Sequence, residues 1–266
     1  MKNLRKLVTL AVSLTMCLSF SSAALAITAN SEQKAVDLQL TTACENGKTK
    51  FVYNYAEKLG SFDGRGITFG CIGFTTGTYD GNILIHYYTK LNSNNNLAKY
   101  IPALDRIDKE EHDEDGKNDD IKGLDNFIKD VKACNDPLFK KAQLYELDEM
   151  YWKPAVSLAT SIGAKHQLTL AFIYDMCVNH GEDGAKEYIN SAKKKLGGLP
   201  KDGIDENKFL SSVMDYRYAF LKDDDPEGSD RVNAYRKLLK AGNVDLKPDF
   251  NFTVYGDTFN IDGDVY

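Results

Sequence analysis

Two carboxylates, Glu45 and Asp63, are the residues whose types and positions in this sequence best suit a catalytic pair. Hydrolysis of a glycosidic bond needs two carboxyl groups beside a cleft, one protonated to donate to the leaving oxygen and one ionised. Glu45 falls at the end of the first predicted helix, and Asp63 opens the turn signal DGRG between two predicted strands. A helix end that faces a small sheet can place two carboxylates across a cleft. Helix ends and Asp-Gly turns also carry such residues for structural reasons, so position alone leaves both interpretations open.

Patterns for other chemistries are missing or incomplete. The sequence contains no G-x-S-x-G, no Cys/His catalytic signature and no phosphate-binding glycine loop. The acidic stretch 105–120, DRIDKEEHDEDGKNDD, would need a Glu at position 122 to form an EF-hand loop around Gly116, but Lys122 stands there. We therefore interpret this stretch as a solvated charged loop. The four histidines show no ligand spacing, and we expect neither a metal nor a cofactor.

The elements that must position the two carboxylates are predicted to be mainly helical. Helical spacing from position 31 ends near Cys44, where Asn46-Gly47 stops it. Alternating aromatics at 51–55 predict a strand, and 67–76 reads as a bent strand; together they form one small sheet, which we expect to be the only one. Further helices are predicted at 83–91, 95–104, 121–131, 137–152, 155–180, 206–221 and 231–240. The long apolar segment 155–180 is the predicted central helix, and the tail after 243 has no clear period.

The first 26 residues have the pattern of an export signal. Lys2, Arg5 and Lys6 precede an apolar run at 7–20, and the segment Ala24-Leu25-Ala26 fits a cleavage site. We expect residues 1–26 to be removed and 27–266 to form a single secreted, extracellular catalytic domain. No later segment is long and apolar enough to cross a membrane, so no membrane association is expected after cleavage.

Charge and cysteine content narrow the class further. Removal of the three basic residues of the signal from the total of 33 leaves 30 against 39 acidic residues, a net charge of −9. This balance argues against nucleic acid and anionic membranes as partners, and it suits a cationic partner. Cys44, Cys71, Cys134 and Cys177 remain after cleavage; they allow three pairings, and buried free thiols remain equally open.

The motifs around both carboxylates resemble those of the bacterial endo-chitosanases of glycoside hydrolase family 46. That family has an E-N, a D-G-R-G-[YI]-T and a G-F-[TC]-[ST]-G-T-x-D in this order, and the chain has Glu45-Asn46, DGRGIT from Asp63 and GFTTGTYD ending at Asp80. The later segments YWKPAVSLA, IYDMCVNHG, 214–232, LKAGNVDL and VYGD are also similar to the family. The resemblance therefore extends over nearly all of the chain after position 26.

The resemblance implies a fold, a mechanism and a catalytic set. The expected fold is lysozyme-like, mainly α, with two helical lobes around a deep cleft, a small antiparallel sheet and a long central helix. The expected reaction is endo-hydrolysis of β-1,4 bonds in chitosan with inversion of configuration. Glu45 matches the general acid, Asp63 the general base, and Thr68 the residue that helps to hold the attacking water. The expected partner is polycationic chitosan, and a monomer is expected.

Further residues match supporting positions of the family. Arg65 stands beside Asp63 and would orient it. The expected substrate-binding residues are Arg65, Asp80, Tyr151 and His180. Three charged residues match an ion-pair network behind the general acid: Asp175, Arg217 and Arg231. Because the acid must keep its proton at the working pH, this network makes sense only if the aspartate offsets the guanidinium charges.

The chain departs from the family pattern in two places. LGSF at 59–62 precedes the DGRG turn where the family has an acidic residue just before it, so the cleavage preference cannot be carried over. The acidic stretch at 105–120 also lies outside the pattern. Two alternatives stay open: a peptidoglycan hydrolase of lysozyme type, which the acidic balance disfavours because cell walls are polyanionic, and a secreted polysaccharide-binding protein without catalysis.

Overall fold

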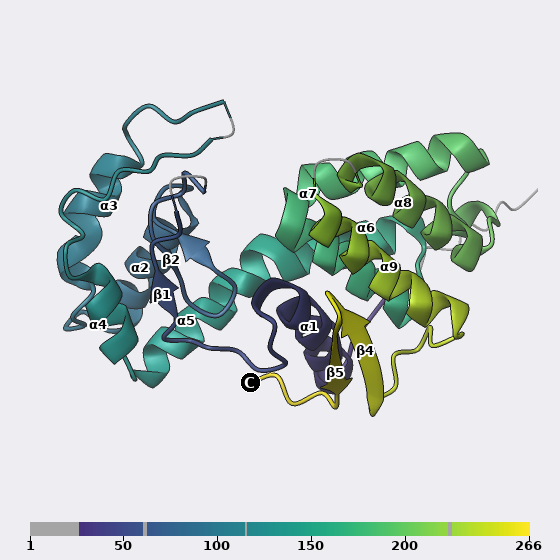
Figure 1. Ribbon diagram of the computed structural model, residues 1–266, viewed down its shortest axis with the longest axis horizontal. Helices are drawn as coiled ribbons and strands as arrows, with labels where there is room; N and C mark the ends of the chain where they lie inside the picture. Colours follow the sequence, from purple (N-terminus) through teal and green to yellow (C-terminus); the bar gives the residue numbers. More distant parts are fainter. Residues whose placement is uncertain (1–26, 61–62, 115, 223–224) are drawn as a thin grey trace, which may run out of the picture.

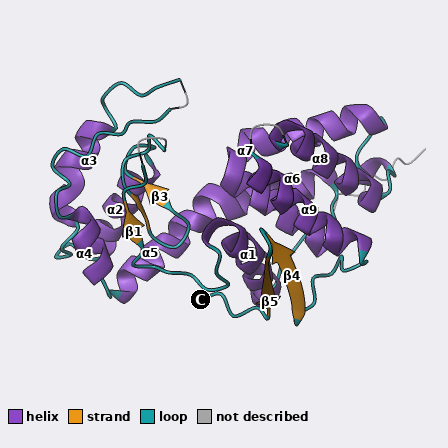
Figure 2. Ribbon diagram, in the orientation of Figure 1, coloured by secondary structure: helices purple, strands orange, loops and turns teal. Residues whose placement is uncertain are grey.

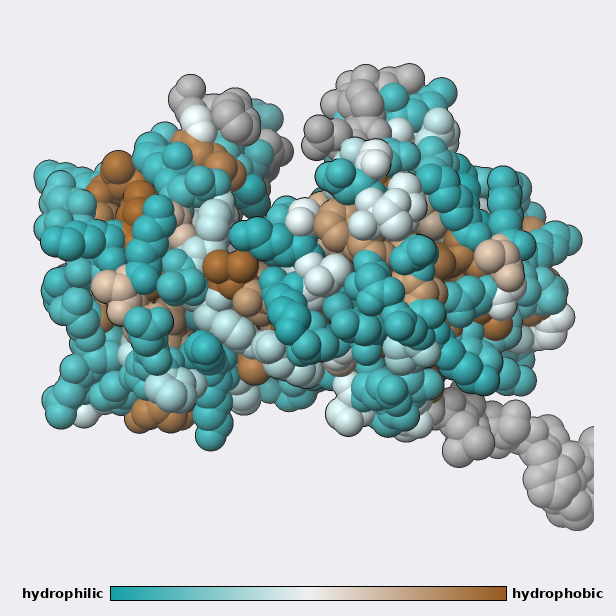
Figure 3. All heavy atoms as spheres, turned by 60° about the horizontal axis from the view of Figure 1, so that its bottom comes forward, coloured by the Kyte–Doolittle hydropathy of each residue, from teal (hydrophilic) through white to brown (hydrophobic). Residues whose placement is uncertain are grey.

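The computed structural model describes residues 27–60, 63–114, 116–222 and 225–266. The predicted export signal at 1–26 lies outside the described residues, as does half of the LGSF segment. No helix of these ranges is long and apolar enough to span a bilayer. The face shown in Figure 3 is mostly hydrophilic, and apolar residues reach it only in small separate patches.

The elements form two groups (Figures 1 and 2). The first contains β1 (Ala56–Glu57), β2 (Thr68–Phe69), β3 (Phe74–Thr75), α2 (Asp80–Leu91), η1 (Ala98–Tyr100), α3 (Ile101–Ile107), α4 (Phe127–Ala133) and α5 (Pro137–Leu147). The second contains α1 (Ser31–Asn46), α6 (Lys153–Ile162), α7 (Gln167–Leu196), η3 (Pro200–Asp202), α8 (Glu206–Leu221), α9 (Pro226–Lys240), β4 (Phe250–Val254) and β5 (Asp257–Ile261). α1 comes first in the sequence but belongs to the second group, because it packs against α7 and the C-terminal hairpin β4–β5.

One helical run connects the two groups. It consists of α5, the π-helical turn η2 (Asp148–Trp152) and α6 without a break. α5 packs on α2 in the first group, whereas η2 and α6 pack on α7 in the second. At its start, Asp136 accepts a hydrogen bond from the Leu138 backbone N–H and Pro137 occupies the first turn, as predicted from their types.

α1 has a well-defined beginning and end. Asn30 and Gln33 form a reciprocal capping box at its N-terminus, and Gly47 ends it in the left-handed conformation with φ 59°. The helix is buried along most of its length, and its last turn carries Glu45. Its packing against α7 therefore fixes where the first candidate carboxylate stands.

The strands form two small antiparallel sheets. In the order β1-β2-β3, Ala56 pairs with Phe69, and Phe69 pairs with Phe74. β4 and β5 form a hairpin in which Phe250 pairs with Ile261. The expected fold class, mainly α with a small antiparallel sheet, is confirmed, but the expectation of a single sheet is wrong. The tail shows no clear period in the sequence because its two strands are short and only partly buried.

Most helix boundaries differ from the sequence predictions by a few residues, and two differences are larger. Residues 51–55 form no strand, and β1 begins only at Ala56. The predicted helix 155–180 is two helices, since α6 ends at Ile162, Gly163 is left-handed with φ 76°, and α7 begins at Gln167. The carboxylate of Glu206, on α8, accepts hydrogen bonds from the backbone N–H groups of Lys165 and His166 at 3.0 Å. It thereby supplies hydrogen-bond partners to the backbone between the two helices. α7 then continues to Leu196 across a kink at Gly181.

The four cysteines of the described residues are free thiols, with Cys44, Cys71 and Cys177 buried. Burial raises the pKa of the Cys177 thiol to about 12 and that of Cys44 further, so both stay protonated at neutral pH. They pack as small apolar side chains.

Candidate active site

A cleft of about 740 Å³ brings residues of both groups together. Glu45 reaches it from α1, Thr68 from β2, Asp80 from the start of α2 and Tyr151 from the π-turn. The remaining lining residues are Asn46, Tyr55, Glu57, Leu59, Arg65, Ile72, Gly73, Thr75, Thr78, Lys117, Val178, Asn179 and Gly181. Five predicted site residues, Glu45, Thr68, Arg65, Asp80 and Tyr151, thus share one cavity, whereas Asp63 and His180 stand beside it.

Glu45 is held from behind by Arg231 of α9. Arg231 donates from Nη1 to Glu45 Oε1, and the carboxylate side chain keeps 30% of its surface exposed. The guanidinium itself is almost fully buried, with 3% of its side chain exposed. Glu45 is therefore fixed on its inner side and open on the other, as a group that must reach a bound ligand requires.

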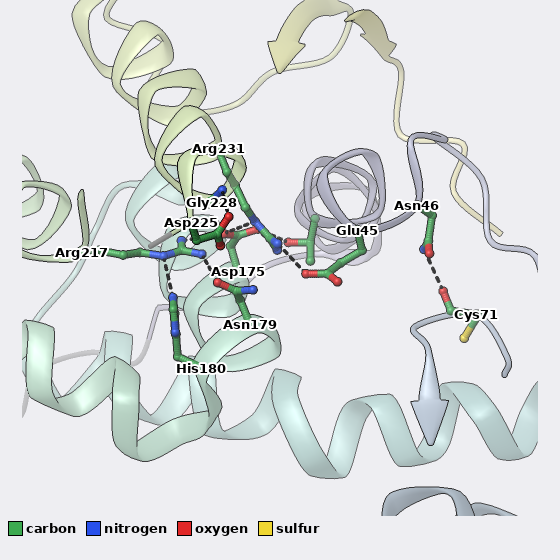
Figure 4. A network of polar contacts seen from close by, with 11 residues as sticks. Glu45, Asn46, Cys71, Asp175, Asn179, His180, Arg217, Asp225, Gly228 and Arg231 are labelled. Atoms are coloured by element: carbon green, nitrogen blue, oxygen red, sulfur yellow. Dashed lines mark hydrogen bonds and ion pairs between the residues drawn. The ribbon is translucent and has the colours of Figure 1, made fainter. Parts of the chain in front are cut away.

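Asp175 of α7 is the centre of the charge network behind Glu45 (Figure 4). Arg231 donates to it from Nε and Nη2 at 2.9 and 2.7 Å, Arg217 donates from Nη1 at 2.7 Å, and Thr41 donates from Oγ1 at 3.2 Å. Burial alone would raise the pKa of Asp175, but the charges of Arg231 and Arg217 outweigh it and lower the pKa to about 2. Asp175 thus balances much of the positive charge that Arg231 brings to Glu45.

His180 contacts the network and not the cleft. Its Nε2 accepts a hydrogen bond from Arg217 Nε at 3.2 Å, while Asn179 Oδ1 accepts from Arg217 Nη2 at 2.9 Å. Burial, and next the charge of Arg217, lowers the pKa of His180 to about 4. A neutral imidazole is what a hydrogen bond from a guanidinium requires. Its neighbours along α7, Asn179 and Gly181, line the cleft in its place.

Asp63 is positioned by its own turn. Arg65 donates from Nε and Nη2 to Asp63 Oδ1 at 2.8 and 2.6 Å, and only 9% of the Asp63 side chain is exposed. Asp63 Oδ2 and Thr68 Oγ1 are both buried and have no hydrogen-bond partner among the described residues. A buried oxygen without a partner is costly unless water or a ligand satisfies it. These two atoms are consequently the ones available to a water molecule at this end of the cleft.

Asp80 begins α2 and is tightly held through one oxygen. Oδ1 accepts from the Thr75 and Gly81 backbone N–H groups at 3.0 and 2.8 Å and from the Thr78 hydroxyl at 3.1 Å. Burial raises the pKa of Asp80 to about 6 although these hydrogen bonds act in the opposite direction. No hydrogen bond within the described residues involves Oδ2, so this oxygen is open to a ligand donor in the cleft.

Three contacts of the site were not predicted in the sequence analysis, although Asn46 belongs to the Glu45-Asn46 motif. Thr41 and Asn179 join the charge network, and Asn46 Nδ2 donates to the Cys71 carbonyl at 3.4 Å, which links α1 to the β2–β3 loop across the cleft. Thr41 stands four residues before Glu45 on α1, and Asn179 stands four residues after Asp175 on α7, so helical spacing from these two predicted residues could have suggested both.

The acidic stretch 105–120 is partly docked and not simply solvated. The Asn118 backbone N–H donates to the Gly77 carbonyl at 3.0 Å, and Asp119 Oδ1 accepts from the Gly66 backbone N–H at 3.3 Å. A side chain at Gly77 would collide with the Asn118 carbonyl oxygen, because a Cβ there would lie 1.8 Å from it. Lys117 lines the cleft. The stretch therefore packs against the DGRG turn that carries Asp63.

Comparisons with known proteins agree on one family. The model of glycosyl hydrolase family 46 matches residues 39–250. A chitosanase of Bacillus subtilis (strain 168) is 39% identical over 230 residues, which cover 82% of this chain and 80% of that protein.

Solved structures give the same result. A mutant chitosanase of Bacillus subtilis MY002 in complex with 6 GlcN has a TM-score of 0.79 at 35% identity, covering 88% of this chain and 100% of that one. A family 46 chitosanase of Gynuella sunshinyii in complex with chitotetraose has a TM-score of 0.79 at 31% identity, with 88% and 99% covered. The match extends over the cleft and the charge network alike, and the chain belongs to glycosyl hydrolase family 46.

Proposed function

We propose that this glycoside hydrolase cuts chitosan inside the chain at β-1,4 bonds by a single displacement with inversion, with Glu45 as general acid and Asp63 as general base. The observation that carries the proposal is that α1, β2 and the DGRG turn meet at one cleft. Glu45 comes from α1 and Thr68 from β2, and Asp63 is bound to Arg65, a lining residue of the same turn. Two carboxyl groups on opposite walls, with space for water, are what inversion requires.

In this mechanism Glu45 protonates the leaving glycosidic oxygen. Its outer oxygen faces the cleft while Arg231 holds the inner one, so the proton can be delivered in a fixed direction. Asp63 Oδ2 takes a proton from the attacking water and Thr68 Oγ1 orients that water; both atoms are buried without another partner in the described part of the chain. Arg65 fixes the remaining oxygen of the base.

Charge supports chitosan as the substrate. Chitosan is a polycation in mildly acidic water, and a protein with a net charge of −9 after signal removal attracts it. Asp80 offers a free carboxylate oxygen to a glucosamine ammonium, and a charge-assisted hydrogen bond of this kind is about twice as strong as a neutral one. Tyr151 contributes an aromatic ring to the same cleft. The relatives named above are chitosanases, and one was solved with glucosamine oligomer bound.

The setting of the reaction is part of the proposal. Removal of residues 1–26 would release residues 27–266 as one extracellular catalytic domain. We propose that it acts as a monomer, with the helical run α5–η2–α6 joining two lobes around the cleft.

A reducing-end assay on three polymers tests the function. We expect rapid release from highly deacetylated chitosan, and little from colloidal chitin or purified cell walls. Added salt should slow the reaction on chitosan, because exposed charge attraction is screened over roughly 8–10 Å at physiological ionic strength. Faster release from cell walls would establish the lysozyme-type alternative, and binding without release of reducing ends would establish a binding protein.

A further inference from the structure

A second hollow lies on the first group of elements, apart from the cleft. It has a volume of about 530 Å³ and lies between α2 and the α5–η2 segment. Its lining includes Ile83, Tyr87 and Lys90 of α2 and Tyr145, Glu146 and Glu149 of the facing segment. It shares no lining residue with the cleft.

Glu146 is the unusual residue of this hollow. Only 5% of the residue is exposed, yet no hydrogen bond or ion pair to its carboxylate occurs among the described residues. Burial, and next the charge of Glu149, raises the pKa of Glu146. The carboxylate oxygens are not among the fully buried unpaired atoms of these residues, so they meet the solvent of the hollow. The position thus offers an acceptor to any donor that enters the hollow.

The carboxylate stands beside an apolar platform. Tyr145 stacks on Tyr87 with ring centroids 4.2 Å apart and planes at 17°. Tyr145 remains 43% exposed, and Ile83, on the same hollow, is 46% exposed. Exposed aromatic faces beside a polar group are suited to ligands with one apolar face and one polar edge. A pyranose ring, whose C–H groups gather on one face, is such a ligand.

The charges of the hollow select a cationic ligand. Its lining has two carboxylates, Glu146 and Glu149, and one ammonium, Lys90. His86 also lines it, but its Nε2 is hydrogen-bonded to Asp105 at 2.7 Å. Glu149 also pairs with Lys153. The charge of Lys90 acts to lower the pKa of Glu146, but no hydrogen bond or ion pair joins the two side chains in the described residues, so Glu146 still lacks a donor. An anionic sugar would face repulsion here, whereas an amino sugar would supply the missing donor.

We infer that the hollow between α2 and α5–η2 is a second binding site for glucosamine units of chitosan, outside the catalytic cleft. The ammonium group of one unit binds Glu146, and its ring packs on Tyr145. The choice of chitosan as ligand rests on the proposed function. α2 carries Asp80 at the cleft and Tyr87 at the hollow, two turns apart, or about 10 Å along the helix. A polymer bound at the hollow is thereby kept at high local concentration near the cleft.

The experiment follows backbone amide shifts while chitotriose in its fully deacetylated form is added to the Glu45→Gln enzyme. We expect two sets of shifting amides with separate affinities, one at the cleft and one at 83–90 with 145–149. Addition of Glu146→Gln should weaken the second set about tenfold, as loss of one charged hydrogen bond predicts, and leave the first unchanged. Tyr145→Ser should act in the same direction.

Glu187→Gln is the matched control, since it removes the same charge from an exposed position of α7 and should change neither set. Fully acetylated chitotriose, which has no ammonium, should fail to shift the second set. The inference is overturned if the cleft set titrates while the second set stays silent, or if Glu146→Gln weakens both sets equally. If deacetylated trimer shifts neither set, the proposed substrate is wrong as well, which separates the two failures.

Discussion

Replacement of Arg231 by Ala tests the charge network most directly. Arg231 bridges Asp175 and Glu45, and its loss leaves Asp175 fully buried with Arg217 and Thr41 as its remaining donors. Removal of one partner from a buried ion pair costs about 3–5 kcal/mol, because an uncompensated charge stays behind. For a chain of this size about 1 kcal/mol lowers Tm by roughly 2–4 °C, so the expected fall is on the order of 6–20 °C.

The same helix provides the control. Arg236→Ala also removes one guanidinium from α9, but Arg236 pairs at 2.8 Å with Asp215, whose side chain is 52% exposed. Exposed pairs contribute about 0–1 kcal/mol, so Tm should fall by no more than roughly 4 °C. Thermal unfolding of the two variants, with initial rates on chitosan, separates buried from exposed charge.

Activity should fall together with stability in Arg231→Ala, because Glu45 loses the contact that fixes its inner oxygen. Adding Asp175→Asn to Arg231→Ala should lower Tm further, because it leaves the fully buried guanidinium of Arg217 without its carboxylate partner. Equal Tm values for the Arg231 and Arg236 variants, or an unchanged rate in Arg231→Ala, would refute the reasoning.

Five further substitutions test the remaining roles. Glu45→Gln should reduce turnover by roughly two to four orders of magnitude while oligosaccharide binding persists, and more than about a tenth of the wild-type rate would remove Glu45 from the acid role. Asp63→Asn should be similarly damaging and Thr68→Ala milder, and proton NMR of early products should show inverted anomers; retained anomers would contradict single displacement. Asp80→Ala should raise KM for deacetylated oligomers, and wild-type KM should rise as pH falls through about 6, where Asp80 takes up its proton. The pKa of His180 is about 4 in the folded state and 6.5 ordinarily, so the unfolded chain binds the extra proton and stability falls as pH drops through this window. His180→Gln should flatten that part of a Tm-against-pH curve, and an unchanged slope would place the acid sensitivity elsewhere.

Local signals in the sequence accounted for much of the fold. α8 begins and ends where its helical spacing predicted, at Glu206 and Leu221, because Asp205 caps it and the apolar positions repeat without interruption. The carboxylates of the cleft were identified from motifs that are contiguous in the chain. Such features depend on residues that are close together in the chain, and these can be read from the sequence.

The features that were missed depend on distant partners. The backbone N–H groups between α6 and α7 are bonded by Glu206, some forty residues later in the chain. Because no nearby residue marks this break, the apolar segment 155–180 has the pattern of one helix. Phe51 donates its backbone N–H to the Val265 carbonyl at 2.9 Å and packs its ring on Tyr266, so the alternating aromatics at 51–55 serve contacts with the C-terminal tail and form no strand. Docking of the acidic stretch likewise depends on the space that Gly77 leaves for Asn118.

Between α5 and α6, the π-helical turn at Asp148–Trp152 makes the number of residues in the helical run important for the fold. Such a turn accommodates one residue more than an α-helical turn. Deletion of one residue from this turn would let the helix close into regular α geometry with α6 almost in its present phase, because the wider turn absorbs the extra residue. Deletion of one residue from the regular turns of α5 has no such outlet and would rotate η2 and α6 by about 100° relative to the first group. α6 would then present another face to α7, and Tyr151 would leave its place in the cleft. The number of residues in this helical run is therefore as much a determinant of the active site as the residues that line it.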